Sequence, residues 1–212
     1  MKCLARPFEL RCNRNEIFLT ADNHKWTADP MFKSTFVLRS MAGFMLALVC
    51  TLPVWADEIY AEVKRGQEIA PVPLQIPADV NPISVYFGSY LVEAVATCNS
   101  CHSNKEYTAI NNPFEGKPKK VNATCYLNGG QSFGSGIVSA NITPDKTGKP
   151  AGITFKTFKN LMRTGHDPRD PGTLLQVMPW DGFQNMTEAS LKAMYDYLSS
   201  IPSLPTGGNS PC

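Results

Sequence analysis

Apolar side chains recur at helical spacing in three segments of the chain, and each segment has a start or a stop signal. The first covers residues 88–97. The second begins after Thr154, a favourable N-cap residue, and ends at Gly165. The third begins after Thr187 and ends before Pro202. The pattern therefore predicts an all-α fold of three helices joined by long loops.

The remaining segments lack this periodicity. Residues 57–84 are rich in proline and predict an extended lead-in, and residues 203–212 predict a flexible tail. Residues 103–150 are rich in Gly, Pro, Asn and Lys and predict loops, with a short strand at 137–139. Residues 166–186 again predict a loop. Three helices supply few apolar residues for a core, so we expect a large apolar group to fill the centre of the domain 85–202.

Residues 31–56 have the pattern of a signal peptide. A positive region with Lys33 and Arg39 precedes an apolar run at 41–52, which is too short to span a bilayer. We predict cleavage after Ala56 and a periplasmic location, with a retained membrane anchor as the alternative.

Residues 1–30 then form an upstream extension, with translation starting at Met31; a long positive region of the signal peptide is the alternative. The formal net charge of +2 gives no reason to expect nucleic acid as a partner.

The strongest local signal is the segment Cys98-Asn99-Ser100-Cys101-His102. This C-x-x-C-H spacing is that of c-type haem attachment. Each of the two thiols can form a bond to one vinyl group, and the adjacent imidazole can bind iron as the proximal ligand. We therefore predict one covalently bound haem c. The alternatives are a redox dithiol, which would need a βαβ surround, and half of a zinc site, which would need two more ligands.

The sixth iron ligand has two candidates in the sequence. Met162 and Met194 lie on predicted apolar helix faces, where core packing is the better interpretation. Met178 lies instead in a loop, before Pro179, which denies it a helix. We therefore predict Met178 as the ligand, with His166 as the rival.

His/Met ligation closes the iron to outside ligands and favours electron transfer over catalysis. The chain has no paired carboxylates, nucleophile triad or Gly-rich phosphate loop, so we expect neither an enzyme nor a small-molecule substrate. A haem peroxidase or a gas sensor is the competing class, and either would need open iron.

Residues 85–202 resemble the class I cytochrome c domain, and in particular the haem domains of the cytochrome c subunits of alcohol and gluconate dehydrogenases. The resemblance is carried by C-x-x-C-H followed by N-I-T-P-D (141–145), R-T-G (163–165) and M-P-W (178–180) in this order. The dehydrogenase subunits carry several haem motifs, whereas this chain has one.

The resemblance implies His102 and Met178 as axial ligands of a haem wrapped by helices and long loops. It also implies that the first and last helices cross, with Gly88 near Tyr195 and Leu198, that the 141–145 segment runs along the haem edge, and that Trp180 reaches a propionate.

The function that follows is a periplasmic electron carrier. It would accept electrons from a dehydrogenase or a quinol-oxidising complex, pass them toward a terminal oxidase, and contact the membrane only through such redox partners. A dedicated haem subunit of one dehydrogenase is the alternative.

Four of the seven cysteines remain after cleavage, and Cys125 and Cys212 are left once haem is attached. Such a pair often forms a disulfide in an oxidising compartment. Cys212, however, is the last residue of a Pro/Gly tail, so the sequence does not decide whether Cys125 and Cys212 are bonded.

Overall fold

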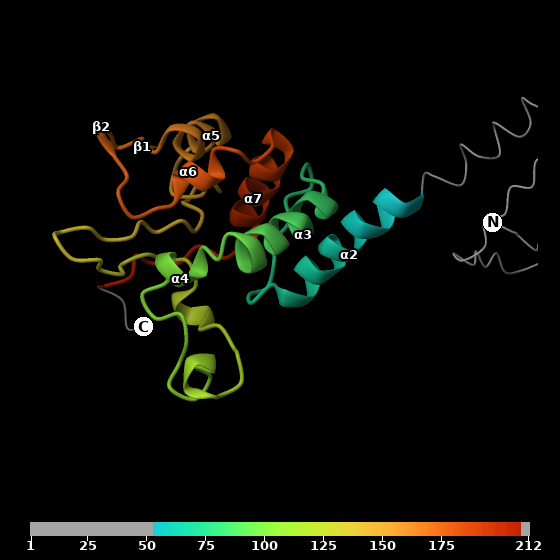
Figure 1. Cartoon of the computed structure of the whole chain (residues 1–212), viewed down its shortest axis with the longest axis horizontal. Helices are drawn as coiled ribbons and strands as arrows, with labels where there is room; N and C mark the ends of the chain where they lie inside the picture. Colours follow the sequence, from blue (N-terminus) through green and yellow to red (C-terminus); the bar gives the residue numbers. More distant parts are fainter. Residues whose placement is uncertain (1–52, 209–212) are drawn as a thin grey trace, which may run out of the picture. The chain divides into compact units, whose positions relative to one another are not determined.

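The computed structural model describes residues 53–208 of the chain (Figure 1). The predicted upstream extension and the predicted signal peptide up to residue 52 lie outside the described residues and stay predictions. Within the described part, no helix has both the length and the apolar character needed to cross a membrane.

The described residues form helices, one small hairpin and long loops. The hairpin is antiparallel and joins β1 to β2, so the predicted all-α fold holds for the helices but omits this pair of strands. The elements in chain order are α2 (Pro53–Ile69), α3 (Pro82–Tyr90), the π-helical turn η2 (Leu91–Val95), α4 (Asn99–His102), the 3-10 turns η3 (Pro113–Glu115) and η4 (Ala123–Cys125), α5 (Phe155–Thr164), β1 (His166–Asp167), β2 (Asp170–Leu174), α6 (Trp180–Phe183) and α7 (Glu188–Ser200).

The caps predicted for the second and third helices are confirmed. The Thr154 side chain accepts a hydrogen bond from Thr157 N at the start of α5, and Thr187 does the same for Ser190 N at the start of α7. Gly165 follows α5 with a φ of 70°, in the left-handed region that glycine tolerates. Local side-chain chemistry therefore fixes the ends of these helices.

The first helix begins earlier than its apolar pattern predicts. Its N-cap is Asn81, which accepts from Ile83 N, and Pro82 occupies the first turn, where its missing N–H is not needed. The helix then continues through the π-helical turn to Val95. The sequence placed the start at Gly88 because only the helical spacing of apolar residues was used, and the Asn81-Pro82 start signal lies before that pattern.

The extended lead-in predicted for residues 57–84 is wrong in its first part. Residues 53–69 form α2, whose sequence contains no proline after Pro53. This helix packs on α3 at Gly66, where an added Cβ would lie 1.8 Å from Tyr86 O. The chain becomes extended only after this helix, where Gln75 N donates to Ser200 O at 2.7 Å.

The crossing of α3 and α7 is the main helix contact of the fold, as the resemblance implies. Its closest point is Gly88 against Ala193 and Tyr197, rather than the expected Tyr195 and Leu198: a Cβ on Gly88 would lie 1.9 Å from Ala193 O. Tyr195 turns instead toward α5, where its ring meets Phe155 at a centroid distance of 5.6 Å.

The hydrophobic core lies between these helices and the turn that follows η4. Tyr126 and Leu127, which belong to that turn, are almost completely buried in it. The other buried members of the cluster come mainly from α3, η2, α5 and α7: Val72, Val85, Leu91, Val92, Phe158, Met162, Leu191, Ala193, Met194, Tyr197, Leu198 and Ile201.

The predicted flexible tail is held in place over residues 203–208. Gly207 N donates to Asn128 O at 2.8 Å, and Leu204 N donates to Thr143 Oγ1 at 3.1 Å. Residues 209–212 lie outside the described part of the chain.

Replacing Gly88 tests the crossing of α3 and α7. In Gly88→Ala the new methyl group meets the backbone of α7, so we expect the free energy of unfolding to fall by about 3 kcal/mol. Urea denaturation of the haem-loaded protein measures it. Gly182→Ala is the control, because Gly182 lies in α6 with open space around it. Equal stability of the Gly88 variant and the wild type would contradict the crossing.

Candidate haem-binding site

The C-x-x-C-H segment folds into one tight helical turn. Thr97 has a φ of 46°, which reverses the chain direction after η2, and Cys98 then caps α4. Its carbonyl accepts hydrogen bonds from Cys101 N at 3.2 Å and His102 N at 2.8 Å. Residues three and four apart lie on one face of a helix, so both thiols and the imidazole share a face of this turn.

The orientation of His102 is set by a backbone carbonyl 38 residues further along the chain. Its Nδ1 lies 2.8 Å from Ala140 O. A carbonyl oxygen can only accept, so Nδ1 carries the proton and the lone pair on Nε2 is left for a metal. Burial lowers the pKa of His102, which favours the neutral imidazole that a metal requires.

Glycine packing fixes the position of that carbonyl. Gly129 N donates to His102 O at 2.6 Å, and a Cβ on Gly129 would lie 2.4 Å from Asn141 N. Asn141 in turn donates through Nδ2 to Leu204 O at 2.8 Å. The N-G-G turn (residues 128–130), the N-I-T-P-D segment and the tail are therefore bonded into one unit that supports His102. Sequence reasoning did not identify Ala140, because a backbone carbonyl leaves no residue-type signal.

The loop that carries Met178 is tied at both ends to the end of α5. Leu175 N donates to Gly165 O at 2.9 Å, and Trp180 covers Gly165 so closely that a Cβ there would lie 2.3 Å from the indole. Arg163 adds a hydrogen bond to Gln184 O. The R-T-G motif thus anchors the loop that carries the M-P-W motif.

Trp180 uses its polar group inside this loop. Its Nε1–H donates to Leu175 O at 3.1 Å, so the indole holds the loop closed. The contact of Trp180 with a haem propionate, which the resemblance implies, stays a prediction.

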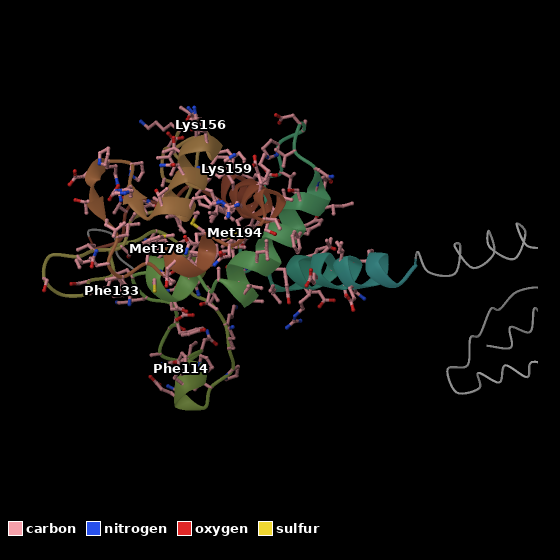
Figure 2. The ribbon with its side chains drawn as sticks, turned by 45° about the horizontal axis from the view of Figure 1, so that its top comes forward. Phe114, Phe133, Lys156, Lys159, Met178 and Met194 are labelled. Atoms are coloured by element: carbon pink, nitrogen blue, oxygen red, sulfur yellow. The ribbon has the colours of Figure 1, made fainter. Side chains whose placement is uncertain are left out.

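The other candidate ligands lie where the sequence predicts them. Met162 and Met194 are each 1% exposed in the core, and His166 is exposed at the start of β1. Met178 is half-buried and packs, like Cys98, against the main hydrophobic cluster. Figure 2 labels Met178 and Met194. Arg169, in the hairpin before the Met178 loop, adds to the lowering of the His102 pKa that burial causes.

The thiols of the turn do not resemble a redox pair. Cys98 and Cys101 are free, and burial raises the pKa of Cys98 to about 12, whereas redox-active cysteines have a lowered pKa. For zinc, the described residues contain no group of three or more His, Cys, Asp or Glu side chains that could hold a metal ion. Cys125 is disulfide-bonded; Cys212 lies outside the described residues, so its pairing with Cys125 stays a prediction.

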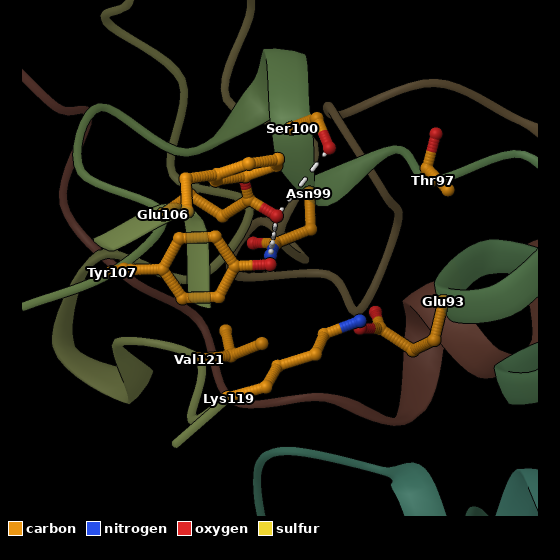
Figure 3. A pocket seen from close by; sticks show the side chains of 9 residues that line it. Glu93, Thr97, Asn99, Ser100, Glu106, Tyr107, Lys119 and Val121 are labelled. Atoms are coloured by element: carbon orange, nitrogen blue, oxygen red, sulfur yellow. Dashed lines mark hydrogen bonds between the residues drawn. The ribbon is translucent and has the colours of Figure 1, made fainter. Parts of the chain in front are cut away.

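A pocket of about 180 Å³ opens beside the turn, on the side of Asn99 and Ser100 (Figure 3). Glu106 accepts hydrogen bonds from both of these side chains, at 3.2 and 3.4 Å. Glu93 lines the same pocket and accepts from Tyr126, whose hydroxyl lies 2.7 Å from that of Tyr197. The sequence gave no indication of this half-buried carboxyl cluster, because its members come from segments that are distant along the chain.

The Glu93 carboxyl is electrostatically unusual. Burial raises its pKa from 4.5 to about 7, and Glu106 adds to this rise, while the Tyr126 hydrogen bond and the charge of Lys119 oppose it. Glu93 therefore changes its charge near neutral pH, a few residues before the C-x-x-C-H turn.

These residues fit a c-type haem. Two free thiols at the required spacing share a helix face with a neutral imidazole whose Nε2 is available, and an apolar cluster lies against them. The donor set is that of covalent attachment plus axial ligation.

Comparison with known proteins agrees with this assignment. The chain is 30% identical over 125 residues, 58% of its length, to the fructose dehydrogenase cytochrome subunit of Gluconobacter japonicus. It is 36% identical over 77 residues to the alcohol dehydrogenase (quinone) cytochrome c subunits of Gluconacetobacter polyoxogenes and Komagataeibacter europaeus. The similarity confirms the predicted resemblance to dehydrogenase cytochrome c subunits.

The matches cover a small part of these relatives. The aligned region spans 22% of the fructose dehydrogenase subunit and 16% of each alcohol dehydrogenase subunit. No protein-family model matches the chain. No solved structure matches it either.

Glu93→Gln tests the raised pKa. The folded protein retains a proton on Glu93 that the unfolded chain loses above pH 4.5, so this stabilisation is complete below pH 4.5 and is lost as the pH rises through 7. At about 1.4 kcal/mol per pH unit the loss is roughly 3 kcal/mol. We expect Glu93→Gln to remove this part of the pH dependence of unfolding, measured with urea. Glu68→Gln, an exposed position on α2, is the control; a Glu93 variant with the wild-type pH profile would contradict the shift.

Proposed function

We propose that this chain is a c-type cytochrome that transfers single electrons through one haem bound to Cys98, Cys101 and His102. The observation that carries the proposal is the α4 turn, in which two free thiols share a face with an imidazole oriented by Ala140 O. The similarity to named cytochrome c subunits supports it independently.

The protein's own groups have distinct tasks in this function. The thiols of Cys98 and Cys101 would each hold a bound haem through one thioether bond, which would prevent loss of the cofactor. His102 supplies Nε2 as the proximal ligand, and its Nδ1–H bond to Ala140 makes the imidazole more basic. The bound haem supplies the one-electron ferric/ferrous couple.

Met178 is the proposed sixth ligand. Its support is threefold: the side chain is half-buried, it packs against the cluster that also contacts Cys98, and its loop is anchored on both sides at Gly165. A thioether stabilises ferrous iron and closes the sixth position, which favours outer-sphere electron transfer over reactions of oxygen or peroxide. His166, by contrast, is exposed at the start of β1.

The proposed route runs in the periplasm, from a dehydrogenase or a quinol-oxidising complex toward a terminal oxidase. The second candidate is a dedicated haem subunit of one dehydrogenase, which the names of the relatives favour. Purification of the native protein at low salt separates the two: a dedicated subunit stays with its dehydrogenase, whereas a shuttle elutes alone.

Covalent attachment is tested by extraction. We expect acidified acetone to leave haem on the wild-type polypeptide, because thioether bonds survive acid. Cys98→Ala and Cys101→Ala should each retain a single bond, which shifts the alkaline pyridine haemochrome spectrum to longer wavelength. Release of haem from the wild type would show that the attachment is not covalent.

Met178→Ala tests the sixth ligand. We expect the reduced variant to bind carbon monoxide while the reduced wild type does not, because removal of the thioether opens the iron. The reduction potential should fall, since thioether ligation favours ferrous iron. Met178→His should keep the site closed but also lower the potential.

Two variants control for indirect effects. Met186→Ala removes a half-buried methionine between α6 and α7, and His166→Ala removes the rival ligand. Both should keep the wild-type visible spectrum and exclude carbon monoxide. If His166→Ala opens the iron and Met178→Ala does not, the haem has two histidine ligands and the proposed ligation by Met178 is wrong.

A further inference from the structure

Residues 104–122, between α4 and η4, form a closed loop that projects from the helical part of the domain (Figures 1 and 2). We call it the tip loop. Its two legs are paired by a bridge between Tyr107 and Val121 and by a hydrogen bond from Asn122 N to Glu106 O at 2.9 Å. The loop is therefore a built element with a defined end.

The end of the tip loop carries two large apolar side chains. Phe114 is 86% exposed and Ile110 is 76% exposed, more than any other large apolar side chain of the described residues. Transfer of such side chains out of water is energetically favourable. Large apolar groups that stay exposed together on a folded domain mark an interaction site.

Local bonds hold these side chains in place. Asn112 caps the η3 turn by accepting from Phe114 N at 3.1 Å, and Gly116 ends that turn with a φ of 72°. The Phe114 ring meets Tyr107 edge-on, with a centroid distance of 6.2 Å. Little conformational entropy would be lost if the end of the loop bound to something.

The tip loop carries more positive than negative side chains. The tip loop contains four exposed lysines and two glutamates. Lys117 pairs with Glu115 at 2.6 Å, and Lys119 points toward Glu93 in the neighbouring pocket (Figure 3). Lys105 and Lys120 add positive charge at the base of the loop, so the whole element has an excess of positive charge.

We propose that the tip loop inserts Ile110 and Phe114 into the interface of an anionic lipid bilayer. A convex end with two large apolar side chains is much smaller than the roughly 800 Å² that each partner buries in a stable protein complex. A deformable lipid surface accepts such an end, and its negative charge attracts the lysines. This inference is independent of the proposed function, and it replaces the expectation that only partner proteins bring the chain to a membrane.

The position of the loop gives this contact a consequence. The tip loop follows directly after His102 and Ser103, so insertion holds the haem-binding turn beside the bilayer. Electron partners that are membrane-bound would then meet the protein by diffusion in two dimensions.

Vesicle sedimentation of the haem-loaded wild-type protein tests the proposal. We expect binding to vesicles that mix phosphatidylcholine with phosphatidylglycerol, and weak binding to phosphatidylcholine alone. The double variant Ile110→Ser/Phe114→Ser should bind at least about tenfold less tightly, because serine lacks the favourable free energy of transfer from water to the bilayer that isoleucine and phenylalanine provide. Lys105→Gln/Lys120→Gln should reduce binding by about fivefold per lysine. Added salt should also weaken binding, because it screens the attraction between the lysines and the anionic lipid.

Ile83→Ser is the matched control, since Ile83 is 59% exposed on α3, away from the tip loop. It should bind vesicles like the wild type. Amide hydrogen exchange gives a readout that does not depend on the variants: exchange within residues 104–122 should slow when anionic vesicles are added. The proposal is overturned if the wild type fails to bind anionic vesicles, if the double variant binds equally well, or if protection appears elsewhere in the chain.

Discussion

The hydrogen bond between His102 Nδ1 and the Ala140 carbonyl is the interaction on which the site depends. It determines which ring nitrogen is free, and leaves the Nε2 lone pair available to a metal. Because the carbonyl belongs to a long loop, its position has to be fixed by other contacts. Gly129 allows the two loop segments to approach to backbone distance, and the C-terminal tail closes the unit through Asn141. These contacts hold the long loop that carries Ala140 in a fixed position where it meets His102.

The helices provide the frame for this unit. The crossing of α3 and α7 at Gly88 fixes the direction of the chain that enters η2, and Thr97 then turns it into α4. The same frame buries Tyr126 and Tyr197 beside the Glu93 carboxyl, which ties the core to the pocket that opens near the C-x-x-C-H turn. The C-x-x-C-H turn therefore lies between the helix crossing and a polar cluster in which burial raises the pKa of Glu93 to about 7.

The sequence by itself determined the parts that depend on local chemistry. Side-chain caps at Thr154 and Thr187, and the left-handed Gly165, defined two helices correctly because each signal acts within one turn. The C-x-x-C-H spacing indicated the cofactor, and the order of the motifs indicated the resemblance that the comparisons confirm. The separation of core methionines from Met178 was also readable, because apolar periodicity distinguishes a helix face from a loop.

Tertiary structure alone decided which distant groups meet. A backbone carbonyl such as Ala140 O has no sequence signature, and the pKa of Glu93 depends on burial by segments far away in the chain. The helix α2 was missed because its stability comes from packing Gly66 against α3 rather than from its own apolar pattern. The acceptor of the Trp180 Nε1–H, Leu175 O, was likewise not readable, because sequence shows that a donor exists but not which acceptor lies within its reach.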